Sequence, residues 1–428
     1  MLRFNENNEV ITEEKYKAIL VGIQVDEDIS YSMEELKGLA EAANTEVLGL
    51  MVQNAERRNT ATMIGKGKVE ELSEMVKNIE ADIVIFNDEL SGMQLRNLEE
   101  ATGVRVIDRT ILILDIFASR AQSREGKLQV ELAQLQYRMP RLTGFGKSLS
   151  RLGGGIGTRG PGEKKLETDR RHIERRVYDI KSELEEIKHT RRTQRQKREK
   201  NEVPVVALVG YTNAGKSALM NRIMSMTDKE DKSVFEKDML FATLDTSQRS
   251  VKADDNHSFI LIDTVGFVSK LPHALVSAFK ATLEEVSEAD LLIHVIDSSF
   301  ENYDFQIEVT EKVLKEIGAG NKERVFAYNK IDLIEKESLI PRPGEECVYI
   351  SAKYGDGSDE LLEIIKSHIF RDEVGAKLLI PYVKGDISSY IMENAIVKAV
   401  DYRAEGTWFD VVLRQQDYQR LSKYEVIE

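Results

Sequence analysis

A glycine-rich loop is the part of this sequence best suited to hold a chain of phosphates. The run GYTNAGKS follows the apolar stretch 203–209 and precedes the helical pattern 218–226. In such a loop the backbone N–H groups turn inward around the phosphates, Lys216 reaches the β and γ oxygens, and the Ser217 hydroxyl coordinates Mg²⁺. The helix that follows adds its positive dipole end to the same anion. The sequence therefore predicts a nucleoside triphosphate site built from Gly210, Tyr211, Thr212, Asn213, Ala214, Gly215, Lys216 and Ser217.

A second strand end carries residues expected near the γ-phosphate. The apolar run 259–262 leads into Asp263, Thr264, Val265 and Gly266. At this position Asp263 can hold Mg²⁺ through a water molecule, and the Gly266 N–H can meet the γ-phosphate. Loss of that phosphate would release the segment, so we expect its position to depend on the nucleotide.

The remaining motifs of the set predict which base is bound. The run 325–328 leads into Asn329, Lys330, Ile331 and Asp332, and the run 348–350 leads into Ser351, Ala352 and Lys353. The Asp332 carboxylate can accept hydrogen bonds from N1–H and N2–H₂ of guanine, a donor pair that adenine does not present. We expect Asn329 to tie the base pocket to the phosphate loop and the Lys330 stem to cover the ring face. The second run would place a backbone N–H near guanine O6. The ordered series therefore indicates a GTP and GDP site.

The threonine of the first switch segment is the least constrained assignment. Thr243 and Thr246 lie close together in the stretch 239–250, and we choose Thr243. Its hydroxyl would complete the Mg²⁺ shell only while the γ-phosphate holds the loop in place. A solvated threonine with no ligand role is the alternative. The predicted contacts of this segment are Phe241, Ala242, Thr243, Leu244 and Asp245.

Phe267 follows the second motif at a position where a glutamine would orient the attacking water. A phenylalanine forms no such hydrogen bond, and a buried packing role would be compatible with this reading. We therefore expect slow Mg²⁺-dependent hydrolysis of GTP to GDP and phosphate, accelerated by a partner surface or a remodelled switch. The predicted catalytic residues are Lys216, Thr243 and Gly266.

The elements around these motifs predict a multidomain α/β protein. Residues 1–110 are expected to form a small parallel α/β domain, because strand-like and helix-like patterns alternate there. Residues 111–200 read as a helical hairpin, 201–370 as the P-loop GTPase domain, and 371–428 as a small α+β domain packed on it. In the first domain, residues 65–68 read GKGK and are expected to open a helix, with an anion site as the second choice.

Charge is distributed unevenly along the chain. The net charge is −14, yet residues 119–200 hold 22 Lys and Arg against 11 Asp and Glu, so this region carries +11 and the remainder −25. Such asymmetry is typical of a protein in which one region approaches a polyanion, and we favour RNA.

The N-terminus lacks an apolar signal region and no apolar run is long enough for a membrane span, so we expect a cytoplasmic protein. The single cysteine, Cys347, is interpreted as a buried structural thiol, and no transition-metal site is expected.

Two amphipathic helical stretches flank a long connector. Apolar residues at 117, 121, 128, 132 and 135 share one side of the first stretch, and those at 173, 177, 180, 184 and 187 are spaced alternately by four and three. Such stripes predict an antiparallel hairpin, although each could instead pack on a neighbouring domain. The connector 141–162 is rich in Gly and Arg and contains Arg141, Lys147, Arg151 and Arg159 without carboxylates. This composition favours a segment that orders against RNA, with a plain linker as the alternative.

These residues resemble the HflX family, bacterial ribosome-associated GTPases of the translation-factor-related class. The resemblance rests on residues 65–68, on 108–138, on GGGIGTRGPGE at 153–163, on 167–175 and on the GTPase motifs, and it covers about residues 16–370. One position departs from the family pattern. Members usually have a proline where this chain has Thr246, which loosens the switch and leaves the choice of Thr243 open.

The resemblance implies a protein that binds the 50S ribosomal subunit and its rRNA and, with GTP and Mg²⁺, splits or recycles stalled ribosomes under stress. The alternative is a GTP-regulated module that docks on RNA or ribosomes and recruits without splitting. A monomer is expected. The trigger, the use of ATP and a transient association with a membrane are left open.

Overall fold

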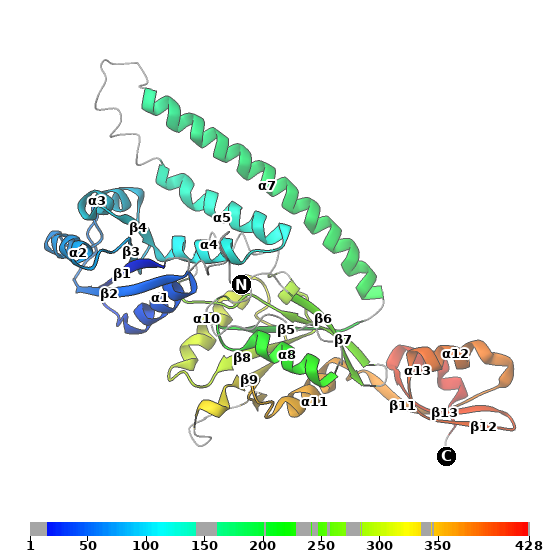
Figure 1. The fold of residues 1–428 in the computed structure, drawn as a ribbon. Coiled ribbons are helices and arrows are strands. Elements are labelled where there is room, and N and C mark those ends of the chain that lie inside the picture. Colours follow the sequence, from blue (N-terminus) through cyan, green and yellow to red (C-terminus); the bar gives the residue numbers. More distant parts are fainter. Residues whose placement is uncertain are drawn as a thin grey trace, which may run out of the picture. The chain divides into compact units, whose positions relative to one another are not determined.

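The structure is a computed structural model that describes residues 15–142, 161–200, 203–227, 241, 247–254, 257–270, 283, 285–334, 344 and 346–426 (Figure 1). The chain divides into two compact units. The first comprises Met1–Gln194, Lys237–Asp245 and Val268–Thr282, and the second comprises Arg195–Glu236, Thr246–Phe267 and Leu283–Glu428.

A four-stranded parallel sheet begins the first unit, as the alternating sequence pattern predicts. Its strands are β1 (Tyr16–Gln24), β2 (Thr45–Asn54), β3 (Ile83–Phe86) and β4 (Arg105–Asp108), in the order β2-β1-β3-β4. The helices are α1 (Ser30–Ala42), α2 (Lys66–Ile79) and α3 (Gly92–Thr102). Central strands buried on both faces explain the continuous apolar runs. Gly65 caps α2, so the GKGK run opens a helix as expected, and the Gly65 N–H donates to the side chain of Gln53 at 2.9 Å.

The helical stretch after β4 is two helices rather than the single one that the periodicity indicates. Helix α4 (Arg109–Arg120) ends at Ala121, which has an extended backbone, and α5 (Arg124–Leu142) follows. Phe117 in α4 is buried, whereas Leu128 and Leu132 in α5 pack against Val177 of α7 (Pro161–Lys200). The apolar residues that the sequence pattern assigned to one helix face therefore pack against different parts of the protein. The break between α4 and α5 makes this possible. The predicted hairpin seam between α5 and α7 is confirmed.

Ile180 is the most deeply buried residue of that seam, with 0% exposure. We expect Ile180→Ala to lower the free energy of hairpin opening by about 2–5 kcal/mol, because it removes buried methyl groups and leaves a cavity. Hydrogen exchange of α5 and α7 amides measures this opening. Tyr178→Ala is the control, since that side chain on the same helix is 74% exposed and its loss should change stability by less than about 0.5 kcal/mol. Equal protection in both variants would contradict the packing described.

A six-stranded sheet forms the core of the second unit. Its strands are β5 (Val205–Gly210), β6 (Ser247–Asp254), β7 (His257–Asp263), β8 (Leu291–Asp297), β9 (Arg324–Asn329) and β10 (Cys347–Tyr349), in the order β10-β9-β8-β5-β7-β6. All pairs are parallel except β6 with β7. The helices α8 (Lys216–Thr227), α10 (Tyr303–Glu316) and α11 (Ser358–Ile369) accompany it.

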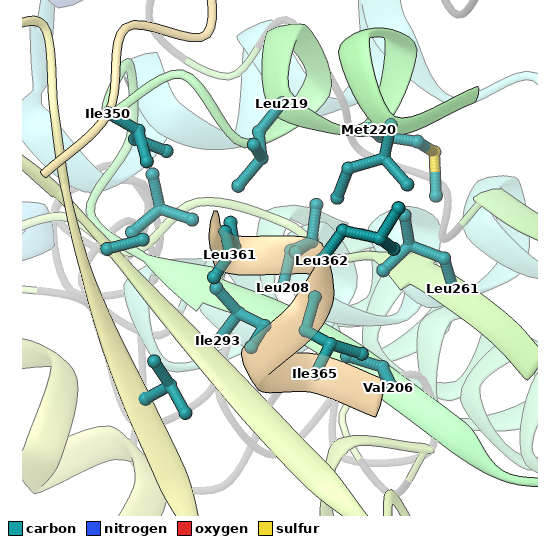
Figure 2. Close-up of a cluster of buried hydrophobic side chains, with 14 of the residues drawn as sticks. Val206, Leu208, Leu219, Met220, Leu261, Ile293, Ile350, Leu361, Leu362 and Ile365 are labelled. Carbon is teal, nitrogen blue, oxygen red and sulfur yellow. The ribbon is translucent and has the colours of Figure 1, made fainter. Parts of the chain in front are cut away.

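One face of this sheet packs on α8 and α11. Figure 2 shows Val206, Leu208 and Ile293 of the sheet beneath Leu219 of α8 and Leu361 of α11. The predicted motifs follow β5, β7, β9 and β10, so they gather at the carboxyl edge of a parallel sheet, where α/β folds bind ligands. Cys347 begins β10 as a half-buried free thiol, less enclosed than the buried thiol expected.

The C-terminal part is a three-stranded antiparallel sheet with two α-helices, which agrees with the α+β pattern expected for residues 371–428. Strands β11 (Glu373–Ile380), β12 (Ile396–Arg403) and β13 (Gly406–Arg414) pair in the order β11-β13-β12, accompanied by α12 (Gly385–Asn394) and α13 (Gln415–Leu421). Leu421 joins the apolar core, which explains the second helix. The Arg403 guanidinium lies 4.7 Å from the centre of the Trp408 ring. Across the described ranges, no helix is both long and apolar enough to cross a membrane.

Candidate guanine nucleotide site

The loop between β5 and α8 has a backbone that its glycines make possible. Gly210 and Gly215 have φ values of 145° and 94°, in the region that side chains rarely enter. A Cβ on Gly210 would lie 2.2 Å from the Val295 carbonyl oxygen, and one on Gly215 would lie 2.2 Å from Asn329 Nδ2. The loop therefore packs directly against Val295 of β8 and against Asn329. A side chain at either glycine would clash with these neighbours.

Lys216 is enclosed in this loop, with 6% of its surface exposed. Its amine donates to the carbonyl oxygens of Gly210 at 3.1 Å and Tyr211 at 2.7 Å. Burial lowers the pKa of Lys216 from 10.5 to about 8, and the Asp263 carboxylate opposes part of that change. A bound phosphate would place a further negative charge beside this amine and favour its protonated form.

This lowered pKa predicts how stability depends on pH without nucleotide. Because the native state binds the Lys216 proton less tightly than the unfolded state, the free energy of unfolding should rise as the pH increases from about 8 to 10.5. Lys216→Met removes the buried charge, so it should stabilise the nucleotide-free protein by roughly 3 kcal/mol at most below pH 8, and less above it. Thermal unfolding of both proteins at about pH 7 and about pH 9.5 measures the difference, which should shrink with pH. A constant difference would contradict the assignment.

Ser217 and Asp263 lie together where a hard cation would fit. The Ser217 hydroxyl donates to Asp263 Oδ2 at 2.6 Å, and the Asp263 side chain is fully buried. An oxygen pair of this kind, with one carboxylate, suits Mg²⁺, which retains several waters and is held by few protein oxygens. The described residues contain no cluster of three or more His, Cys, Asp or Glu side chains that could hold a metal ion.

The segment after Asp263 is fastened to the phosphate loop. The Phe267 N–H donates to the Gly210 carbonyl at 3.2 Å, and the Thr212 N–H donates to the Phe267 carbonyl at 2.7 Å. Phe267 is buried, with 2% exposure. Its side chain therefore packs in the interior, which the sequence analysis gave as compatible with slow hydrolysis. A Cβ on Gly266 would lie 2.5 Å from Thr212 Cα and 3.0 Å from Lys216 Nζ, which places Gly266 against the loop.

The base motif is tied to the same loop, as expected. Asn329 Nδ2 donates to the Ala214 carbonyl at 2.8 Å, and the Ala352 N–H donates to Asn329 Oδ1 at 2.9 Å. The Ser351 hydroxyl donates to Asp332 Oδ1 at 2.7 Å and fixes the carboxylate predicted to read guanine. Three motifs distant in sequence are thus joined through Asn329.

Sequence reasoning missed one residue of this group. Asp297, at the end of β8, forms an ion pair with Lys330 at 2.7 Å, and Lys330 has a left-handed backbone with φ of 67°. The position of Asp297 after an apolar strand at the same sheet edge could have identified it.

The other predicted residues divide into three groups. Tyr211, Thr212, Ala214, Thr264, Val265 and Ile331 are buried around the motifs, and the Thr264 hydroxyl donates to the Leu208 carbonyl at 2.7 Å. Lys353 is exposed, and Asn213 is partly so. Phe241 is described and buried, whereas Ala242, Thr243, Leu244 and Asp245 lie outside the described residues.

Comparison with known proteins decides the family. Family models match three consecutive regions: "GTP-binding GTPase N-terminal" at residues 30–118, "GTP-binding GTPase Middle Region" at 120–198, and "50S ribosome-binding GTPase" at 205–330. The chain is 50% identical over 398 residues to GTPase HflX of Caldanaerobacter subterraneus, covering 93% of this chain and 91% of that protein. The chain belongs to the HflX family of GTPases.

A second HflX protein is consistent with this membership. GTPase HflX of Escherichia coli K12 is 40% identical over 415 residues, 96% of each protein. A crystal structure of SsGBP in complex with GDP has a TM-score of 0.48 and 26% identity, covering 83% of this chain and 98% of that one. As a member of the HflX family, the protein binds guanine nucleotide through its P-loop domain and hydrolyses GTP.

Proposed function

We propose that this GTPase binds the 50S ribosomal subunit through its rRNA and, with GTP bound, splits or recycles stalled ribosomes in the cytoplasm. The observation that carries the proposal is the charge of +11 in region 119–200, in a protein of net charge −14. The described helices of this region, α5 and α7, pack against each other. The matching family model for residues 205–330 is described as a 50S ribosome-binding GTPase, which supports the choice of partner.

Many basic side chains on the body of the hairpin have acidic partners. Arg176 binds Glu131 through two hydrogen bonds of 2.7 Å, and Arg191 pairs with Glu125 at 2.7 Å. Hydrogen bonding to Arg176 lowers the pKa of Glu131. These pairs join α5 to α7 and reduce the charge available to RNA along the hairpin body.

Arg141 also proves to have partners, contrary to the sequence interpretation that grouped it with uncompensated connector residues. It ends α5, where its guanidinium donates to the Leu90 carbonyl at 3.0 Å and lies 3.8 Å from the buried carboxylate of Asp108. Tyr137 shares that carboxylate at 2.5 Å. Arg141 therefore anchors the base of the connector. The RNA contact rests on Lys147, Arg151 and Arg159, which lie outside the described residues.

The nucleotide chemistry rests on the P-loop residues. Lys216, Ser217 and the Gly266 N–H would hold the β- and γ-phosphates, while Ser217 and Asp263, the latter through water, together with Thr243 would hold Mg²⁺. The metal, when bound, would neutralise the charge that develops on the phosphate oxygens. Phe267 offers no hydrogen bond to water, so we propose that hydrolysis is slow until a partner acts. The protein would act as a monomer.

Replacing the three connector residues tests the proposed contact. A variant with Lys147, Arg151 and Arg159 changed to alanine should lose about 10-fold or more in affinity for 50S subunits in the presence of a slowly hydrolysed GTP analogue, and its affinity should depend less steeply on salt. Sedimentation with purified subunits measures both. The matched control changes Arg195, Lys197 and Arg198 near the other end of α7. Equal affinity losses in the two variants would contradict a specific role for the connector.

A further inference from the structure

Helix α8 begins at the phosphate loop and also packs beside the segment that carries the predicted base contacts. Leu219 of α8 shares the apolar core of the six-stranded sheet with Leu361 of α11 (Figure 2). Ser351 lies in the segment that joins β10 to α11. The phosphate side and the base side of the nucleotide site are therefore built on elements that contact each other.

Residues 351–356 close into a turn around Ser351, which we call the guanine-side turn. The Ser351 N–H donates to the Asp356 carbonyl at 3.0 Å, and the Gly355 N–H donates to the Ser351 carbonyl at 2.6 Å. The Ser351 hydroxyl donates to Asp332 Oδ1 at 2.7 Å. All three polar groups of Ser351 are thus engaged, so a displacement of the turn would move the carboxylate that is predicted to read guanine.

The side chain of Arg222, from α8, lies against the backbone of the guanine-side turn. A Cβ on Gly355 would lie 2.0 Å from Arg222 Nη2, 2.3 Å from its Cζ and 2.6 Å from its Nε. Three atoms of the planar guanidinium therefore fall in the space that a side chain at this position would fill. Gly355 also has a φ of 94°, so glycine suits both the backbone and the contact.

Hydrogen bonding does not account for the whole of this arginine. Its Nε is buried and, among the residues that the structure describes, has no hydrogen-bond partner. A buried donor without an acceptor destabilises a fold, and replacing it with an apolar group of similar shape can be neutral or stabilising. A residue that is unfavourable for stability beside a binding site is more readily explained by function than by folding.

The place of Arg222 on α8 gives the contact its significance. The helix starts at Lys216, the predicted phosphate-binding lysine, and reaches Arg222 six residues later. Six residues of helix span about 9 Å along the axis. One helix thus carries a predicted phosphate contact at its first residue and supports the guanine-side turn at Arg222.

We propose that Arg222 is a positioning residue for guanine recognition. Its guanidinium supports Gly355, and Gly355 holds Ser351 through its N–H. The Ser351 hydroxyl then orients the Asp332 carboxylate toward the N1–H and the 2-amino group of guanine. The inference rests on the proposed role of Asp332 in reading the base, and it requires nothing of ribosome binding.

Competition between GDP and IDP for the full-length protein tests the proposal. Hypoxanthine keeps the N1–H and O6 of guanine but lacks the 2-amino group, so the ratio of the two affinities reports the hydrogen bond from that group to Asp332. The wild type should prefer GDP by about 10-fold or more, because the acceptor is charged.

Arg222→Met keeps a side chain of similar length without the guanidinium. The preference for GDP should fall by about fivefold or more, while the thermal unfolding temperature stays equal or rises because a buried donor without a partner is removed. Arg222→Lys keeps the positive charge without the planar group, so it should lose the preference to a similar extent.

Lys366→Met is the matched control, since it removes a cation from α11 that pairs with Glu363 at 2.9 Å. This variant should keep the preference for GDP. The proposal is overturned if Arg222→Met keeps the full preference, if it unfolds at a lower temperature than the wild type, or if Lys366→Met loses the preference as well. A wild type that binds GDP and IDP alike would overturn it together with the role of Asp332. None of these results bears on ribosome binding.

Discussion

Replacement of Asp332 by asparagine is expected to transfer the preference of the site from guanine to xanthine nucleotides. The carboxylate offers acceptors only and suits the two donors of guanine, whereas an asparagine offers one acceptor and one donor group. Xanthine carries a carbonyl where guanine has its amino group, so it matches the variant. Two hydrogen bonds to a charged group are lost, and GTP affinity should fall about 10²-fold or more.

Competition between GTP and XTP for the same protein measures this change. Asp297→Asn is the matched control, because that carboxylate pairs with Lys330 at 2.7 Å and is not predicted to meet the hydrogen-bonding edge of the base. The control should weaken both nucleotides alike and leave the preference for GTP intact. A variant at Asp332 that still prefers GTP over XTP would show that another residue reads the base.

Gly266→Ala is expected to suppress hydrolysis by about 10²-fold or more, the effect of losing one backbone donor to a developing charge. The added methyl group would lie 2.5 Å from Thr212 Cα, a backbone atom that cannot move without displacing the phosphate loop. The Gly266 N–H would be pushed away from the γ-phosphate. GDP affinity should change little, since GDP lacks that phosphate.

Single-turnover hydrolysis and binding of both nucleotides separate these effects. Gly375→Ala is the control, because a Cβ there has no atom within 4 Å and the residue lies in β11 of the same unit. It should leave both measurements unchanged. If Gly266→Ala hydrolysed GTP at the wild-type rate, the segment after Asp263 would have no part in sensing the γ-phosphate.

The nucleotide site could be predicted from sequence because its chemistry is local. Each motif is a few consecutive residues at a strand end, and the order of the strands in a parallel sheet brings those ends to one edge. The tie from Asn329 to Ala214 was predictable for the same reason and is confirmed. The pairing of Asp297 with Lys330 was missed because an aspartate after a strand can have many roles. Its role here depends on Lys330, which follows the neighbouring strand β9.

Contacts within the first unit were beyond the reach of pattern reasoning. Periodicity assigned Phe117 to the hairpin stripe, but it packs against Phe241, more than a hundred positions away. Arg109 and Glu35 look like ordinary charged positions on helices, and only the fold shows that they are buried. Arg141 was counted as a connector charge because its partners, Leu90 before α3 and Asp108 at the end of β4, are distant in the sequence. Helical spacing identifies an apolar face without identifying what covers it.

Light scattering of intact ribosomes tests the central proposal most directly. Mixing them with the protein and a slowly hydrolysed GTP analogue should lower the scattered light as subunits separate, whereas GDP should leave the signal unchanged. The variant lacking the basic side chains at Lys147, Arg151 and Arg159 should fail with either nucleotide. Binding without any loss of scattering would support a docking role instead, and equal effects with GDP and the GTP analogue would contradict a nucleotide-driven splitting factor.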